Sequence, residues 1–341
     1  EAQVIGLLAI LTLPVALLAN KGLSILIIFA TLSVLFFGLI HSRRPILPNR
    51  PIMAVLIGIG LLSIISSTWS ITPLISVNKG IMFFLLMMTV VILTGAVRSL
   101  DAREVKIIRT GILVGGSIGY GILAEEVVTG GAIAELFLLA SGIDNVSSKG
   151  MMAMLNPGAV VAAIFFWPWS YEFYRRFPNI VGVIVPVLVL STFLWVEAES
   201  PLVGLILSGV VFVATFLRSK LAFVVVSVML TGGLILAPSI VKLFPHPVTN
   251  FEKIDFLSNS SLHRLLIWHT VKDHIRDRPW IGHGFETTRS LYDREDKVWI
   301  NFGSDKTGNQ KKVFFEPIPL HAHNGVLQVW LELGGLGVLL L

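Results

Sequence analysis

The chain contains no cysteine among its 341 residues. Disulfide bonds, thiolate nucleophiles and cysteine-bound iron–sulfur clusters are therefore excluded. Charged residues are scarce too, at 14% of the chain, against about a quarter in a soluble domain. Hydrophobic residues, in contrast, reach 54%. This imbalance predicts an all-α polytopic membrane protein.

Long apolar runs divide the chain into three parts. A helix needs about 20 mostly apolar residues to cross the hydrocarbon core. We expect about ten such helices: 4–19, 22–40, 51–68, 80–97, 107–124, 151–169, 179–196, 201–217, 221–243 and one that begins near Asn324. The parts are then a transmembrane bundle over 1–244, a polar loop domain over 245–322, and the start of a further helix over 323–341. We expect that last helix to continue beyond Leu341.

The positions of lysine and arginine predict which way the bundle faces. Eleven of them fall in every second connection, whereas only Lys21, Lys79 and Lys149 fall in the others. The positive-inside rule places the eleven in the cytoplasm. The loop domain 245–322 is then on the opposite side, which for a bacterial inner membrane is the periplasm.

The loop domain is predicted to contain one amphipathic helix near 260–277. Ser260 or Ser261 is suited to cap its amino end, and Pro279 to end it. The sequence GHG at 282–284 predicts a turn. The stretch 286–316 is charged and contains Gly and Asn, which favours irregular loop.

Ionisable side chains next to the apolar runs are few and lie at the predicted periplasmic ends. They include Glu197, Glu199, Lys79 and Lys149. Charges near a bilayer are costly, which makes them functional candidates. A carrier would need polar groups near the middle of the membrane, so this one-sided distribution argues against a transporter or flippase.

Two histidines, His321 and His323, stand directly before the last apolar run. Their spacing is compatible with zinc, with Glu316 nearby, but a second cluster of ligands is missing and we predict no metal site. In one interpretation the two histidines only form hydrogen bonds with loop backbone. A neutral imidazole at position 323 is also suited to take a proton from a sugar hydroxyl.

The loop arginines allow two interpretations. Arg264 either anchors the helix at lipid headgroups or binds a diphosphate, because guanidinium is permanently charged and bidentate toward phosphate. Arg276, Arg278 and Arg289 are weaker candidates of the same kind. Trp268 is predicted at the membrane interface beside them.

These motifs resemble bacterial O-antigen ligases and the related O-antigen polymerases. His323-Asn324 followed by Gly334-x-x-Gly337, within HAHNGVLQVWLELGGLG, is similar to the signature of that family. SLHRLLIW followed by RPWIGHGFE resembles its arginine-bearing loop element. STWSITPLISVNKG (67–80) and MLNPGAVVA (154–162) resemble two of its helices, so the likeness covers most of the chain.

The resemblance implies a bundle of twelve helices in the full-length protein, with a large periplasmic loop before the last ones. It implies transfer of a glycan from an undecaprenyl diphosphate carrier to lipid A–core or another glycan acceptor, without a cofactor, metal or nucleic-acid partner. His323 would be the essential histidine and Arg264 a ligand of the diphosphate. Lys79, Lys149, His321, Asn324 and Trp268 would contribute to substrate binding, and Glu197 or Glu199 to orienting the acceptor.

One position departs from the family pattern. The family often has Ser-Arg-Gly after the seventh helix, whereas this chain has EAESPLVG, with Pro201 in place of the arginine. Either a different cation, Lys79 or Lys149, replaces this arginine, or this branch of the family acts on a different donor or acceptor. An O-antigen or exopolysaccharide polymerase, a flippase for lipid-linked saccharides and a non-catalytic scaffold are the alternatives to a ligase.

Overall fold

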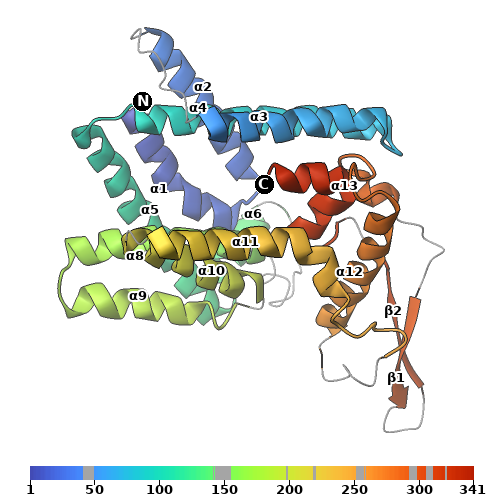
Figure 1. The fold of residues 1–341 in the computed structure, drawn as a ribbon. Coiled ribbons are helices and arrows are strands. Elements are labelled where there is room, and N and C mark those ends of the chain that lie inside the picture. The colour runs from blue at the N-terminus through green and yellow to red at the C-terminus, as the bar shows by residue number, and fades with distance from the viewer. Residues whose placement is uncertain are drawn as a thin grey trace. The chain divides into compact units, whose positions relative to one another are not determined.

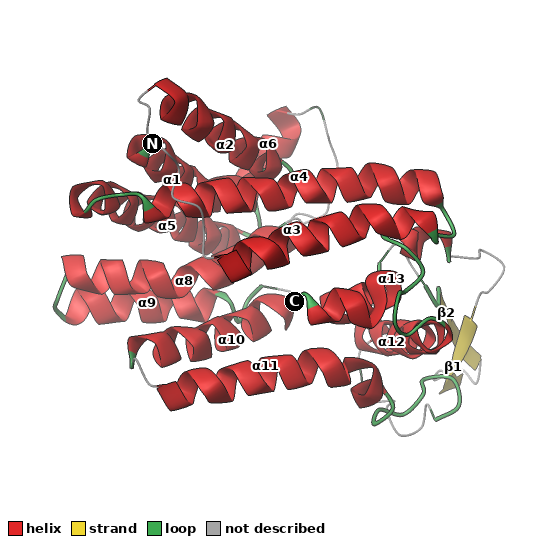
Figure 2. Ribbon diagram, turned by 45° about the horizontal axis from the view of Figure 1, so that its top comes forward, coloured by secondary structure: helices red, strands yellow, loops and turns green. Residues whose placement is uncertain are grey.

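The computed structural model describes residues 1–40, 50–140, 142, 155–196, 199–217, 220–250, 257, 259–291, 298–304, 310–318 and 321–341. These residues form two compact units, each built from two separate parts of the chain. Unit 1 comprises Glu1–Pro48 and Ile92–Val226, and unit 2 comprises Asn49–Val91 and Ser227–Leu341. Figures 1 and 2 show that both are built mainly from helices.

Unit 1 is entirely helical in its described residues. Its helices are α1 (Ala2–Leu18), α2 (Gly22–Ile40), α5 (Ala102–Thr129), α6 (Ala132–Ala140), α8 (Asn156–Arg176), α9 (Ile180–Thr192) and α10 (Glu199–Phe216). The end of α4 and the start of α11 also belong to it. Tyr120, Phe166, Trp169 and Phe193 are buried together in its main core.

Small residues let α5 pack closely against α1. Gly111, Gly115 and Gly119 repeat every four residues along one face of α5. A Cβ atom added at Gly115 would lie 2.5 Å from the carbonyl oxygens of Ala9 and Ile10. Such small-residue stripes allow close backbone contact between membrane helices, where water supplies no hydrophobic driving force.

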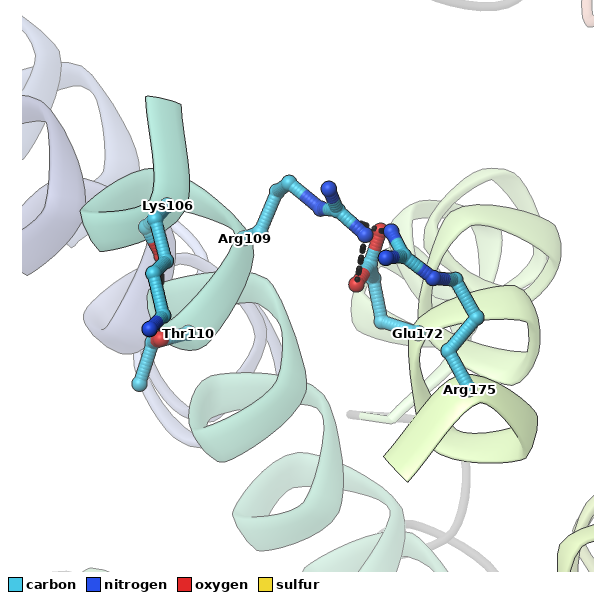
Figure 3. A network of polar contacts seen from close by, with 5 residues as sticks. All are labelled: Lys106, Arg109, Thr110, Glu172 and Arg175. Carbon is cyan, nitrogen blue, oxygen red and sulfur yellow. Dashed lines mark hydrogen bonds and ion pairs between the residues drawn. The ribbon is translucent and has the colours of Figure 1, made fainter. Parts of the chain in front are cut away.

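An ion pair joins α5 to α8 near the end of unit 1 that carries the predicted cytoplasmic charges (Figure 3). Arg109 Nε donates to Glu172 Oε1 at 2.8 Å, and a second guanidinium nitrogen donates to Oε2 at 3.0 Å. Arg175 lies 3.9 Å from the same carboxylate. Bidentate geometry of this kind fixes the relative direction of two side chains, so it aligns the two helices.

Unit 2 combines a helical hairpin with a polar region. Its elements are α3 (Arg50–Ile65), η1 (Ser66–Thr68), most of α4 (Pro73–Arg98), most of α11 (Lys220–Val241), α12 (Asn259–Asp277), η3 (Thr287–Ser290), β1 (Val298–Ser304), β2 (Gln310–Phe315) and α13 (Gly325–Leu339). The ends of α11, α12 and α13 share a core that includes Val241, Ile267, Val271, Leu327 and Leu331. α12 and α13 therefore lie side by side (Figure 2).

Every predicted apolar segment contains a helix. Among the described residues, five helices are long and apolar enough to cross a membrane: Gly22–Ile40, Arg50–Thr68, Pro73–Arg98, Ala102–Thr129 and Lys220–Val241. Four others, including α1 and α13, are apolar but shorter. The α-helical membrane class is thus supported, whereas ten spans in this chain, twelve in the full-length protein and a periplasmic position for 245–322 remain predictions.

One local prediction differs from the structure, and one helix was not predicted. The stretch 286–316 is not wholly irregular, because β1 and β2 form an antiparallel hairpin in which Val298 pairs with Phe315. The β-branched and aromatic residues of VWINF and KVFF favour strands, despite the charged residues between them. Helix α6 was not expected, because its nine residues are too few to span a bilayer.

Candidate active site

His323 occupies a strained turn directly before α13. Its φ of 49° lies in the left-handed region, which residues with a Cβ atom seldom adopt. The next residue, Asn324, caps α13: its side-chain oxygen accepts from the backbone N–H groups of Val326 and Leu327 at 3.1 and 3.2 Å. Asn324 therefore ends the turn and begins the helix. The rings of His321 and His323 lie 4.2 Å apart between centroids.

Helix α12 supplies positive charge beside this turn. Partial burial is the largest influence that lowers the pKa of His323 below its ordinary value, followed by His321, Arg264 and His263. His263 Nε2 donates to the carbonyl of Glu316 at 2.9 Å, which ties α12 to the end of the hairpin. His323 is therefore mainly neutral at pH 7, as a general base must be.

The structure brings together only some of the predicted site residues. His321, His323, Asn324, Arg264 and Trp268 belong to the α12–α13 part of unit 2. Arg276 is exposed near the end of α12, and the Arg278 guanidinium donates to the carbonyl of Trp69 at 3.2 Å. Lys79 is exposed on α4. Of Arg289 only the backbone is described, within η3.

The remaining candidate residues either lie outside the described residues or belong to unit 1. Lys149 and Glu197 lie outside the described residues. Glu199 begins α10 in unit 1, and its side chain is likewise not described. Within the described part of the chain, no group of three or more His, Cys, Asp or Glu side chains is arranged to hold a metal ion.

The glycine motif of α13 marks a break in the helix. Gly334 has φ 65° and ψ −161°, a conformation almost restricted to glycine. In an unbroken helix the carbonyls of residues 331 and 332 would accept from residues 335 and 336. Instead, the Leu331 carbonyl accepts from the His283 N–H and the Glu332 carbonyl from the Gly284 N–H, each at 2.9 Å.

The same loop satisfies the other side of the break. Gly335 N–H donates to the carbonyl of Pro279 at 2.8 Å, and Leu336 N–H to that of Trp280 at 3.1 Å. The segment PWIGHG therefore replaces the missing helical hydrogen bonds with four of its own. Backbones approach closely here: a Cβ atom at Gly334 would lie 2.4 Å from the Trp280 carbonyl carbon. The PWIGHG loop and the Gly334-x-x-Gly337 motif of α13 are thus the two sides of one contact, which we call the joint.

The connection between α3 and α4 holds the outer side of this loop. Trp69 Nε1 donates to the carbonyl of Ile281 at 3.0 Å. The Phe285 N–H donates to Ser66 Oγ at 3.0 Å, and Ser76 Oγ donates to the carbonyl of Phe285 at 2.6 Å. The segment 66–76 therefore has a structural role, because it supports this loop.

Three polar residues of the site were missed by the sequence analysis. Glu332 is only 3% exposed, and it accepts from the hydroxyl of Thr288 at 2.7 Å and from the amide of Gln328. One signal was present, because Glu332 is a charge inside an apolar run, which is a functional candidate by default. Nothing in the spacing of Thr288 could have linked it to α13.

An apolar cavity of about 610 Å³ opens beside the turn. It is lined by Met229 and Leu234 of α11, by Phe244 in the turn after that helix, and by Trp268, Asn324 and Val326. The indole N–H of Trp268 has no hydrogen-bond partner among the described residues. The cavity thus reaches from apolar helix surface to the residue that follows His323.

Comparison with known proteins finds a family match over the part of the chain that contains this site. Residues 187–341 match the sequence profile of the O-antigen ligase family. This segment is therefore similar to the O-antigen ligase family. It includes the broken helix, the PWIGHG loop and α12, so the resemblance drawn from the motifs is confirmed.

Related proteins of rickettsiae are named as candidate polysaccharide ligases. Those of Rickettsia typhi and Rickettsia prowazekii are each 30% identical to this chain, over 188 and 187 residues, and that of Rickettsia felis is 28% identical over 187 residues. Each match covers 55% of this chain and 44% of the relative. The chain therefore spans less than half the length of these relatives. No solved structure matches.

Proposed function

We propose that this protein is a membrane glycosyltransferase of the polysaccharide ligase type. The observation that carries the proposal is a histidine with a lowered pKa, His323, near the cation of Arg264 and next to Asn324, which lines an apolar cavity. These three features correspond to a base, a phosphate ligand and a place for a lipid. The family of residues 187–341 and the names of the rickettsial relatives support the same reaction class.

In the proposed reaction, an acceptor hydroxyl attacks the anomeric carbon of a glycan linked to undecaprenyl diphosphate. His323 takes the hydroxyl proton as the new glycosidic bond forms. The bond between the anomeric carbon and the diphosphate oxygen breaks, and the lipid diphosphate leaves with one more negative charge. Arg264 stabilises that charge, which is the largest to develop in the transition state. Arg276, Arg278, Arg289 and Lys79 are proposed as further cations around the diphosphate.

The apolar cavity supports a lipid-linked donor. A polyprenyl tail needs apolar surface, whereas its diphosphate needs cations and water. The cavity beside α11 is mainly lined by apolar residues, and Asn324 is also part of its lining. A lipid whose tail lay there would have its diphosphate near Arg264 and His323.

We further propose lipid A–core as the acceptor and the periplasmic face of a bacterial inner membrane as the location. The distribution of lysine and arginine supports this orientation. Glu197 or Glu199 would orient the acceptor. Lys149 would supply positive charge in place of the family arginine, which is Pro201 in this chain. Membrane lipids would surround the bundle. The reaction needs neither a nucleotide sugar nor a metal ion.

The test is transfer by the purified full-length protein in lipid vesicles. It is incubated with undecaprenyl diphosphate-linked glycan and lipid A–core, and the products are separated by gel and mass spectrometry. His323→Ala and Arg264→Gln are expected to reduce turnover at least about 100-fold, typical of losing a general base or a preorganised charge. His246→Gln and Lys272→Gln are matched controls, because they remove the same residue type or charge elsewhere in unit 2.

Each product supports a different conclusion. Glycan on lipid A–core that disappears in His323→Ala supports the ligase. Longer glycans that stay on the undecaprenyl carrier would make the protein a polymerase of the same family. Normal turnover in both site variants would refute the assigned roles, and no transfer to either acceptor would refute the proposed function.

A further inference from the structure

A buried carboxylate lies at the centre of a hydrogen-bond network inside the broken helix. Glu332 Oε2 accepts from the backbone N–H of Glu286 at 2.8 Å, and Oε1 accepts from the hydroxyl of Thr288 at 2.7 Å. The side-chain amide of Gln328 donates to the same Oε1. Glu332 is 3% exposed and Thr288 is 0% exposed. Neither side chain is therefore in a position to touch a substrate.

Gln328 connects this carboxylate to the histidine turn. Its amide nitrogen also donates to Thr288 Oγ1 at 2.9 Å. Its amide oxygen accepts from the backbone N–H of Ala322 at 2.8 Å. Ala322 lies between the two histidines and is fully buried. The network therefore ends on the backbone that carries His323.

The turn needs such an anchor because its backbone is strained. A left-handed conformation costs a residue with a Cβ atom roughly 1–2 kcal/mol, and it persists only where the surroundings fix it. His323 has that conformation, with φ 49°. Gln328 holds the residue before it, and Asn324, the residue after it, is fixed as the cap of α13. Both flanks of the histidine are thus held.

The network also reaches a second part of the site. Glu286 and Thr288 flank the start of η3, and the backbone of Arg289 follows directly. Glu286 is itself left-handed, with φ 60°. One carboxylate therefore fixes the turn that bears the proposed base and the turn that bears a candidate diphosphate ligand.

We propose that Glu332, Gln328 and Thr288 are positioning residues that hold His323 in its reactive orientation. The proposal rests on the proposed function for the reaction, but on hydrogen-bond geometry for the network. The three residues act through the backbone of Ala322 and of η3. They do not contact the donor or the acceptor.

The first test compares substitutions that keep or remove the hydrogen bonds. Thr288→Val and Gln328→Met preserve approximate size but break the network, whereas Thr288→Ser keeps the hydroxyl. Displacement of a reacting group by about 1 Å can cost about 100-fold in rate. We expect kcat per folded molecule to fall at least tenfold in Thr288→Val and Gln328→Met, with donor KM within about threefold. Thr288→Ser should retain kcat within about threefold.

Trp330→Phe is the control for the loss of a hydrogen bond elsewhere on α13. Trp330 Nε1 donates to the carbonyl of Leu234 at 2.8 Å, outside the Glu332 network. This variant should keep the wild-type kcat. Folded protein is quantified in every variant, so that lower abundance is not mistaken for lower turnover.

The second test does not depend on activity. Diethyl pyrocarbonate modifies histidine only when its imidazole is neutral. The pH dependence of modification at His323, read by peptide mass spectrometry, therefore reports the pKa of this residue. In the wild type the midpoint should lie below the ordinary value of about 6.5, because of burial and the neighbouring His321, Arg264 and His263. In Thr288→Val and Gln328→Met it should move toward about 6.5, and in Thr288→Ser and Trp330→Phe it should not move.

The outcomes separate the two proposals. Wild-type kcat and wild-type modification midpoints in both Thr288→Val and Gln328→Met would overturn the positioning role. The proposed function would be unaffected by that result, because His323→Ala tests it separately. A loss of folded protein alone, with unchanged kcat per folded molecule, would overturn it as well. If the wild type transfers no glycan, the proposed function fails, and the modification midpoints still decide whether the network positions His323.

Discussion

Replacement of Gly334 by alanine should release the PWIGHG loop from α13. The φ of 65° and ψ of −161° at this position cost a residue with a Cβ atom roughly 1–3 kcal/mol. The added methyl group would also lie 2.4 Å from the Trp280 carbonyl carbon. Overpacking of this kind costs typically about 1–3 kcal/mol. The docked loop should therefore be destabilised by about 2–6 kcal/mol.

The absence of cysteine provides a direct assay for this opening. Thr287 is 0% exposed within the loop region, so T287C gives a single thiol that is protected while the loop is docked. Every 1.4 kcal/mol corresponds to a factor of ten in population. Gly334→Ala should therefore speed maleimide labelling of this thiol by about 30-fold to about 20,000-fold relative to the parent that carries T287C alone.

Gly325 offers a control on the same helix. It begins α13, and a Cβ atom there would meet nothing within 4 Å. Gly325→Ala should leave labelling within about twofold and slightly stabilise the helix, by up to about 1 kcal/mol. Labelling of Gly334→Ala within threefold of the parent would refute the proposed joint, and equal acceleration in Gly325→Ala would show that the effect is not specific to it.

Three further predictions concern the histidine turn and the orientation of the chain. The acid limb of the kcat/KM profile should lie below pH 6.5, because the pKa of His323 is lowered and the base must be neutral; in Arg264→Gln the residual activity should show this limb at higher pH, since a nearby cation is lost. Asn324→Ala should cost about 1 kcal/mol as a lost helix cap, measured by thermal unfolding, whereas Asn324→Asp should keep the cap and raise the pKa of His323. In intact cells a membrane-impermeant maleimide should label K272C but not R103C; labelling of R103C alone would reverse the predicted orientation.

The sequence predicts the helices of this protein well because bilayer-length apolar runs are a strong and local signal. Charge scarcity and run length were sufficient to locate α2, α4, α5 and α11. The hairpin β1–β2 was missed because its short runs of aromatic and β-branched residues lie within a charged stretch, 286–316, whose composition favoured irregular loop. Helix α6 was not predicted, because a search for bilayer-length apolar runs does not find a helix of nine residues.

The candidate site was predictable in its residue types but not in its connections. His323 and Arg264 were identified from chemistry and from family resemblance. The role of Asn324 as a helix cap follows from its position directly before an apolar run, yet the left-handed turn of His323 does not. The network of Glu332 required knowledge that Thr288, 44 residues earlier, lies against it. Contacts at that separation depend on the tertiary fold, which composition and periodicity do not specify.

The break in α13 explains how polar residues at the end of an apolar helix can be held in a fixed geometry. A continuous helix satisfies its own backbone, so it has no groups left with which to fix a neighbouring loop. The break at Gly334 exposes two carbonyls and two amides, and the PWIGHG loop takes all four. That loop leads directly to Glu286 and Thr288, whose groups donate to Glu332, two residues before the break. Gln328 then extends the same hydrogen-bond network one turn further, to Ala322 and the histidine turn.

The glycines, the carboxylate and His323 therefore belong to one connected network of hydrogen bonds. A change at Gly334 should alter the rate of transfer, even though Gly334 is not proposed to touch either substrate.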